Sequence, residues 1–149
     1  MILAIDPGLH SGWSVLSEVE GLLDLGYGET WPLGLWPGKF QAIIECPEVY
    51  PDTRAPQANN LITLALRVGR YQERLEAKGV PVRLVLPKVW KGQLPKPVHH
   101  IRGRKKMTPK EQAIEDRCLQ LVPLSHHLDA KDARNLALWA AGRLPKSGY

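Results

Sequence analysis

The sequence predicts an α/β fold in which helices pack on a mixed five-stranded sheet. Two observations carry this prediction. Apolar runs of strand length recur in the first 45 residues, and the apolar spacing changes to three and four residues from about residue 57. A further short apolar run follows that helical segment, and more helical spacing follows it in turn. Strands and helices in this order are typical of a sheet covered by helices.

Five segments have the pattern of strands. Residues 2–6 form a continuous apolar run that ends in a carboxylate, and a Pro-Gly pair then turns the chain. Four more strands are expected over 12–16, 22–28, 40–45 and 82–86. The first three are separated by short turns, which predicts a β-meander at the N-terminal end of the sheet.

Three segments have the pattern of helices. Residues 57–78 place apolar side chains at intervals of three and four, and Gly79 follows as a stop signal. Thr108 and Pro109 are typical of an N-cap and a first helical position, which predicts a helix up to about Leu121. A last helix is expected over 130–142 from its alanine- and leucine-rich stripe.

The composition limits the class of protein. A chain of 149 residues with 44% hydrophobic residues is expected to form one domain, 1–149, with a buried core. The sequence has no apolar stretch near the roughly 20 residues of a membrane span and no signal-peptide pattern, so we expect a cytoplasmic protein without a membrane partner. Cys46 and Cys118 lack CxxC spacing and are interpreted as packed thiols.

Charge is distributed unevenly along the chain. Residues 1–52 hold eight acidic side chains and one basic one, although the net charge is +5. Residues 77–110 hold no acidic side chain and half of all Lys and Arg. These are Lys78, Arg83, Lys88, Lys91, Lys96, Arg102, Arg104, Lys105, Lys106 and Lys110. The window favours a phosphate-contacting surface, and a solvated surface loop is the alternative interpretation.

Four carboxylates are the main candidates for chemistry. Asp6 and Glu45 end apolar runs, and Asp129 and Asp132 lie three apart on a predicted helix, where they share a face. If the strands of Asp6 and Glu45 are parallel neighbours, all four gather, and such a cluster favours two divalent ions that would support phosphodiester hydrolysis. A turn role for Asp6 and a capping role for Asp129 are the alternatives.

Four segments that contain these acids, 2–16, 43–71, 86–93 and 128–142, resemble in order the conserved blocks of RuvC-type Holliday-junction resolvases of the ribonuclease H-like superfamily. The resemblance implies a ribonuclease H-like fold with Asp6, Glu45, Asp129 and Asp132 as catalytic metal ligands. It also implies two Mg²⁺ ions per active site, with Mn²⁺ as a possible substitute, and no small-molecule cofactor. The implied partner is a four-way DNA junction, which a homodimer nicks symmetrically on two opposing strands.

The same resemblance extends to less distinctive positions. Lys91 falls where the family has a lysine in a P-x-x-x-K block and is a candidate catalytic residue, and Lys110 falls near a second family lysine. Tyr50 falls near a family aromatic that inserts into the junction and stacks on a base. A plain surface lysine or a tyrosine that covers the sheet end is the alternative. The predicted nucleic-acid contacts are Tyr50, Lys88, Lys91, Lys96, Arg102, Arg104, Lys105, Lys106 and Lys110.

The sequence departs from the family pattern in two places. Residues 30–39 are too short for the long amphipathic helix expected there, which indicates a longer connection that begins earlier or a trimmed variant. Residues 92–107 read as a basic loop that reaches across a junction, with His99 and His100 inside it.

Two pairs of histidines stand out, His99 and His100 in this loop and His126 and His127 just before Asp129. They are interpreted as phosphate contacts or plain loop residues, because no four-ligand zinc pattern is present in the sequence. His127 is close enough to the acids in sequence to touch a metal-bound water. Nuclease action on RNA or RNA–DNA hybrids, and a catalytically silent branched-DNA-binding module, remain alternatives.

Overall fold

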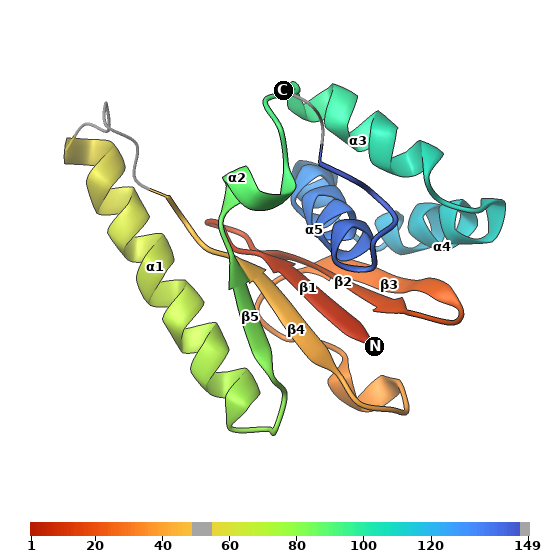
Figure 1. Cartoon of the computed structure of the whole chain (residues 1–149), viewed down its shortest axis with the longest axis horizontal. Coiled ribbons are helices and arrows are strands. Elements are labelled where there is room, and N and C mark those ends of the chain that lie inside the picture. The colour runs from red at the N-terminus through yellow and green to blue at the C-terminus, as the bar shows by residue number, and fades with distance from the viewer. Residues whose placement is uncertain (49–54, 147–149) are drawn as a thin grey trace.

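The computed structural model describes residues 1–48 and 55–146, with the side chains of 55–58 outside the description. Five strands form one sheet (Figure 1). Their bounds are β1 Ile2–Asp6, β2 Gly12–Ser17, β3 Gly21–Tyr27, β4 Gln41–Glu45 and β5 Val82–Val85. The helices are α1 Ala55–Glu76, α2 Pro87–Trp90, α3 Lys96–Lys105, α4 Pro109–Leu119 and α5 His127–Ala140, with 3₁₀ turns at Leu33–Leu35 and Leu124–His126.

The strand order is β3-β2-β1-β4-β5. The first three strands form the predicted antiparallel meander, whereas β4 and β5 run parallel to β1. The predicted architecture is therefore confirmed: the chain forms a mixed five-stranded sheet flanked by helices.

Helices cover the two faces of the sheet separately (Figure 1). On one face, α1 buries Val68, Tyr71 and Leu75 against strand residues such as Leu3 and Ile44. On the other face, α5 and α4 bury apolar side chains against the alternate strand residues, among them Leu136, Leu138, Ala4 and Ile43. Because successive strand residues point to opposite faces, the continuous apolar run of β1 supplies both cores.

The predicted helices exist, with small differences at their ends. The helix predicted over 57–78 spans Ala55–Glu76, and Gly79 follows with φ +77°, as its role as a stop requires. At α4 the Thr108 side chain accepts from the backbone N–H of Glu111, and the Glu111 side chain accepts from that of Thr108, which is a complete capping box. The last helix begins three residues earlier than predicted, at His127.

The prediction of a basic loop over 92–107 was wrong. Residues 96–105 form α3, which packs on α5. The backbone carbonyls of His99 and His100 accept from Asn135 and Arg134 of α5, and Gly103 lies against the side chain of Asn135. Pro97, at the second position of α3, is compatible with a helix start. Because the segment also contains four Lys and Arg residues, its sequence resembled a solvated loop and the helix was not predicted.

The connection between β3 and β4 contains only a 3₁₀ turn, Leu33–Leu35, among its described residues. β3 nevertheless reaches Tyr27, so the long helix expected from the family pattern is replaced by a short connection rather than by a shortened strand. Trp31 and Trp36, on this connection, pack in or against the α1-side core and not on a solvent face. In the described part of the chain, no helix combines the length and apolarity needed to cross a membrane.

Candidate active site

Two of the predicted acids stand at the ends of neighbouring parallel strands. Asp6 ends β1 and Glu45 ends β4, and the register pairs Ile5 with Ile44 immediately before them. The carboxyl ends of parallel neighbours meet at one edge of the sheet, so the two carboxylates lie side by side, as predicted from the sequence.

The third acid reaches this edge because α5 approaches β2 closely. Gly12 is the register partner of Asp6, and a Cβ at Gly12 would collide with the backbone carbonyl of Asp129. One turn further along α5, the buried Ser14 hydroxyl donates to the carbonyl of Ala133 at 2.8 Å. Close packing therefore requires a glycine at position 12. The close approach of α5 to β2 brings Asp132 of the helix to Asp6 of the sheet.

Asp6, Glu45 and Asp132 form an electrostatic cluster. Burial of Asp6 raises its pKa well above the usual value, and the charges of Glu45 and Asp132 raise it further, against an opposing effect of the Lys91 ammonium. Interaction between the Asp6 and Asp132 carboxyl groups contributes to the raised pKa of Asp6 and to the lowered pKa of Asp132. Strongly perturbed carboxyl groups that repel one another are typical of functional sites rather than of structural ion pairs.

Glu45 accepts from two donors on and after α2. The indole Nε1 of Trp90, a buried residue, donates to Glu45 Oε2 at 2.7 Å. The ammonium of Lys91 lies 3.1 Å from the same oxygen and 3.3 Å from Oε1. The predicted catalytic lysine is therefore brought to the acid cluster, whereas the part played by Trp90 was not foreseen.

Asp132 accepts from two donors on α3. His100 Nε2 lies 2.6 Å from Asp132 Oδ1, and Lys96 Nζ lies 3.4 Å from Oδ2. Burial opposes ionisation of Asp132, but the His100 hydrogen bond and the Lys96 charge outweigh it and hold its pKa below the usual value. Lys96 and His100 are four residues apart on one helix face, a spacing that would have paired them had 96–105 been recognised as a helix.

Asp129 does not join the other three acids. Its side chain is 35% exposed, and its Oδ2 lies 3.4 Å from His126 Nδ1. It is not the N-cap of α5, because His126 occupies that position without a capping side chain. The His126 ring stacks in turn on Tyr27 and contacts the His10 ring in a tilted arrangement. The structure thus places Asp129 in the first turn of α5, near the cluster but bonded elsewhere.

His127 does not face the acids, so the expectation that it touches a metal-bound water was wrong. Its Nε2 lies 2.9 Å from the carbonyl of Leu119 and 2.8 Å from that of Val122, at the end of α4. This histidine fastens α4 to the start of α5. Its neighbours in sequence gave no signal of that role, since the contact depends on the angle between the two helices.

The cluster fits hard divalent cations by its chemistry. Carboxylate oxygens are the ligands that Mg²⁺ and Mn²⁺ prefer, and a cation among three acids would relieve the repulsion that raises the pKa of Asp6. Within residues 1–48 and 55–146, no three His, Cys, Asp or Glu side chains already converge as a cation site. Glu45 and Asp132 are instead turned toward the donors described above.

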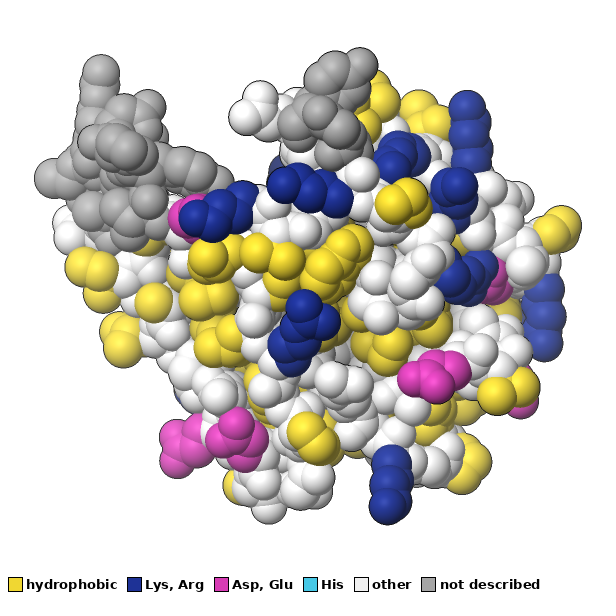
Figure 2. Space-filling model, viewed as in Figure 1, with side chains coloured by type: hydrophobic (Ala, Val, Ile, Leu, Met, Phe, Trp, Pro, Cys, Tyr) yellow, Lys and Arg dark blue, Asp and Glu magenta, His cyan; other side chains and the backbone are white. Residues whose placement is uncertain are grey.

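Of the predicted nucleic-acid contacts, Lys91 and Lys96 lie at the acid cluster, and the others differ in exposure and pairing. Lys105, Lys106 and Lys110 are exposed on α3 and α4, and Figure 2 shows Lys and Arg side chains along the upper edge and right side of the molecule, over these helices. Lys88 pairs with Glu48 but is exposed. Arg104 and Arg102 are engaged in contacts within the protein, since Arg104 pairs with Glu115 and Asp116, and Arg102 donates to the carbonyl of Pro145. Tyr50 lies outside the described residues.

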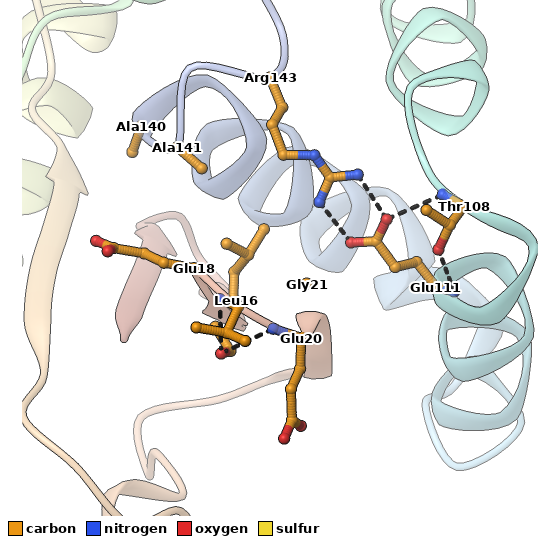
Figure 3. Close-up of a pocket in the computed structure, with 11 residues that line it drawn as sticks. Leu16, Glu18, Glu20, Gly21, Thr108, Glu111, Ala140, Ala141 and Arg143 are labelled. Carbon is orange, nitrogen blue, oxygen red and sulfur yellow. Dashed lines mark hydrogen bonds and ion pairs between the residues drawn. The ribbon is translucent and has the colours of Figure 1, made fainter.

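A further buried acid, Glu111, lies at the other ends of β2 and α5. It lines a hollow together with residues of the β2–β3 turn, and Figure 3 shows the guanidinium of Arg143 facing its carboxylate. Both contacts to Arg143 measure 2.6 Å, and Glu111 also accepts from the backbone N–H of Leu22 at 2.7 Å. Burial opposes ionisation, but these bonds prevail and lower the pKa of Glu111 to about 2.

Comparisons with known proteins concern the fold. No family model and no curated protein matches the chain. Among solved structures, it is similar to T. thermophilus RuvC in complex with a Holliday junction substrate, with 19% sequence identity and a TM-score of 0.47. That similarity covers 93% of this chain and 93% of the other.

Proposed function

We propose that the protein is a metal-dependent endonuclease that resolves four-way DNA junctions by paired, symmetric nicks. The observation that carries the proposal is the acid cluster of Asp6, Glu45 and Asp132 at the carboxyl ends of the strands, where burial and mutual repulsion raise the pKa of Asp6. The motifs that resemble RuvC-type resolvases supply the junction as the expected substrate.

The roles follow from position. Asp6, Glu45 and Asp132 would hold the divalent ions, two Mg²⁺ or Mn²⁺ per site, and Asp129, in the first turn of α5, would have to turn away from His126 to join them. Bound ions would activate a water molecule and stabilise the leaving oxygen. The Lys91 ammonium, 3.1 Å from Glu45, would stabilise the charge that develops on the phosphate.

The charge distribution suits a nucleic-acid substrate. Acid clusters repel phosphates, so the exposed Lys105, Lys106 and Lys110 on the neighbouring helices would provide the compensating attraction. Two nicks in opposing strands require two active sites, and the described residues of each chain form one such cluster. We therefore propose that the working form is a homodimer.

Cleavage of defined substrates tests the proposal. The protein is incubated with a synthetic four-way junction, a linear duplex of the same sequence and an RNA–DNA hybrid, each with Mg²⁺ and with chelator. Paired nicks confined to the junction and dependent on Mg²⁺ are expected. Preferential cleavage of the hybrid would assign the alternative nuclease activity, and tight junction binding without any cleavage would leave a binding module.

A further inference from the structure

We propose that Trp90 and His100 are positioning residues that orient the two outer carboxylates of the acid cluster, and that the segment 87–105 is the element that holds them in place. This inference rests on the proposed function, since it assigns these side chains a role toward the cations. Neither side chain is a metal ligand in the proposed site. The contacts that carry the inference come from α2 for Glu45 and from α3 for Asp132.

The Trp90 indole is a fixed donor. It is 1% exposed and packs in the core beneath the sheet edge, so its Nε1 is held at 2.7 Å from Glu45 Oε2 without freedom to turn away. An indole N–H donates one hydrogen bond, accepts none and does not titrate in the physiological range. It can therefore orient the Glu45 carboxylate, yet it cannot replace a cation or act as a base.

The backbone of His100 is held in place by a buried arginine of α5. The backbone carbonyl of His100 accepts from Arg134 Nη2 at 2.9 Å, and the Arg134 guanidinium is buried against the carboxylate of Glu115. The buried network thereby sets the distance between α3 and α5. Its visible consequence is the 2.6 Å contact between His100 Nε2 and Asp132 Oδ1.

The two donors act on different members of the acid cluster. With Glu45 held from α2 and Asp132 held from α3, the remaining lone pairs of both carboxylates have a defined orientation before any cation binds. Donors of this kind typically contribute about 10- to 100-fold to metal affinity, because a ligand that must be reoriented binds at an entropic cost. We expect an effect of that size from each.

Trp90→Phe removes the indole N–H and keeps an aromatic ring. Trp31→Phe is the matched control, because Trp31 is also buried, lies on the other face of the sheet and has no partner for Nε1 among the described residues. The readouts are Mn²⁺ affinity of the DNA-free protein by electron paramagnetic resonance and the Mg²⁺ concentration for half-maximal junction cleavage. Trp90→Phe is expected to weaken both roughly 10-fold or more, with cleavage recovering at saturating metal, and Trp31→Phe to leave both unchanged.

His100→Leu and His100→Gln form the second pair. Leucine removes the donor, whereas the glutamine amide can again donate to Asp132, so metal affinity is expected to fall with leucine and to return in large part with glutamine. Equal loss in both, or a Trp90→Phe effect no larger than that of Trp31→Phe, would overturn the positioning roles.

The Asp6→Asn variant separates this inference from the function on which it rests. If Asp6→Asn loses Mn²⁺ binding and cleavage while the Trp90 and His100 variants behave as their controls, only the positioning roles fail. If the wild-type protein neither binds Mn²⁺ nor cleaves, the proposed function fails with them.

Discussion

The buried carboxylates of α4 and those of the acid cluster differ in how their charge is balanced. Glu111 and Glu115 each face an arginine, Arg143 for the first and Arg134 for the second. Asp6, Glu45 and Asp132 face one another, with Lys91 and Lys96 at their margins. The same kind of group therefore has a pKa of about 2 at Glu111 and a pKa well above the usual value at Asp6.

The difference separates acids that stabilise the fold from acids kept for chemistry. Removing one partner of a buried carboxylate–guanidinium pair leaves an unpaired buried charge and destabilises the native state, whereas a cluster of like-charged carboxylates is itself a cost that the rest of the fold must offset. Such costs are typically retained where function requires them. Amide substitutions should accordingly change stability in opposite directions in the two groups.

The largest effect is expected from Asp6→Asn. Junction cleavage should fall on the order of 100- to 1,000-fold, because a ligand to ions that supply several kcal/mol of transition-state stabilisation is lost. Removal of the charge should also raise the melting temperature of the metal-free protein, since burial and like charges oppose ionisation of Asp6. Cleavage rates and calorimetry measure the two effects, and a lowered melting temperature would contradict the difference between the two groups of acids.

Glu115→Gln should show the opposite behaviour. The Glu115 and Arg134 side chains are 0% and 1% exposed, so loss of one partner strands the other charge and should destabilise the protein by about 3–5 kcal/mol. Asp116→Asn is the control, because Asp116 pairs with the same Arg104 but is 59% exposed and should cost less than about 1 kcal/mol. Urea denaturation compares them, and equal losses would argue against the structural role of Glu115.

The pH dependence of stability tests Glu111. Its pKa falls from 4.5 to about 2 on folding, so its ionised form stabilises the native state above pH 4.5, and that contribution is lost as the pH falls toward 2. The contribution amounts to about 3 kcal/mol. Glu111→Gln should be less stable than wild type at pH 7 and should lose less stability on acidification. Parallel acid titrations of the two proteins would contradict this account.

Gly12→Ala tests whether close packing of α5 builds the acid cluster. The added Cβ would meet the backbone of Asp129, so α5 must shift, at a cost of about 1–3 kcal/mol, and Mn²⁺ affinity should fall as well. Gly69→Ala is the control, since a Cβ there has open space on α1 and should stabilise by about 0.4–1 kcal/mol. Unchanged metal affinity in Gly12→Ala would separate the packing from the site.

The smallest effect concerns the basic surface. Lys105→Ala with Lys106→Ala should weaken junction binding and reduce the salt slope by about one for each phosphate that is no longer neutralised. Lys39→Ala with Lys78→Ala is the charge-matched control, because both lysines are exposed and precede β4 and β5, at the ends of these strands that lie away from Glu45. Fluorescence anisotropy at several salt concentrations provides the measurement, and equal slopes in the two double variants would reject this surface.

The strands and two of the site acids could be predicted because they depend on local pattern. An apolar run that ends in a carboxylate fixes the place of Asp6 and of Glu45 once β1 and β4 are known to be parallel neighbours. Thr108 and Glu111 likewise define the start of α4 by their own spacing.

The donors to these acids could not be predicted because they depend on packing between distant elements. Trp90 reaches Glu45 across 45 residues, and His100 reaches Asp132 across 32. The density of cations around α3 suggested a solvated loop, whereas its buried histidines and Gly103 show a helix packed on α5. Asp129, similar to Asp132 in sequence, differs because its side chain turns toward His126.

Mn²⁺ binding to wild type, Asp6→Asn and Glu111→Gln tests the central claim most directly, because the acids of both variants are buried in the same protein and differ in how they are paired. The account predicts that Mn²⁺ binding, measured by electron paramagnetic resonance without DNA, is lost in Asp6→Asn and retained in folded Glu111→Gln. Binding that survives in Asp6→Asn, or that is lost equally in both variants, would contradict the assignment of the acid cluster as the metal site.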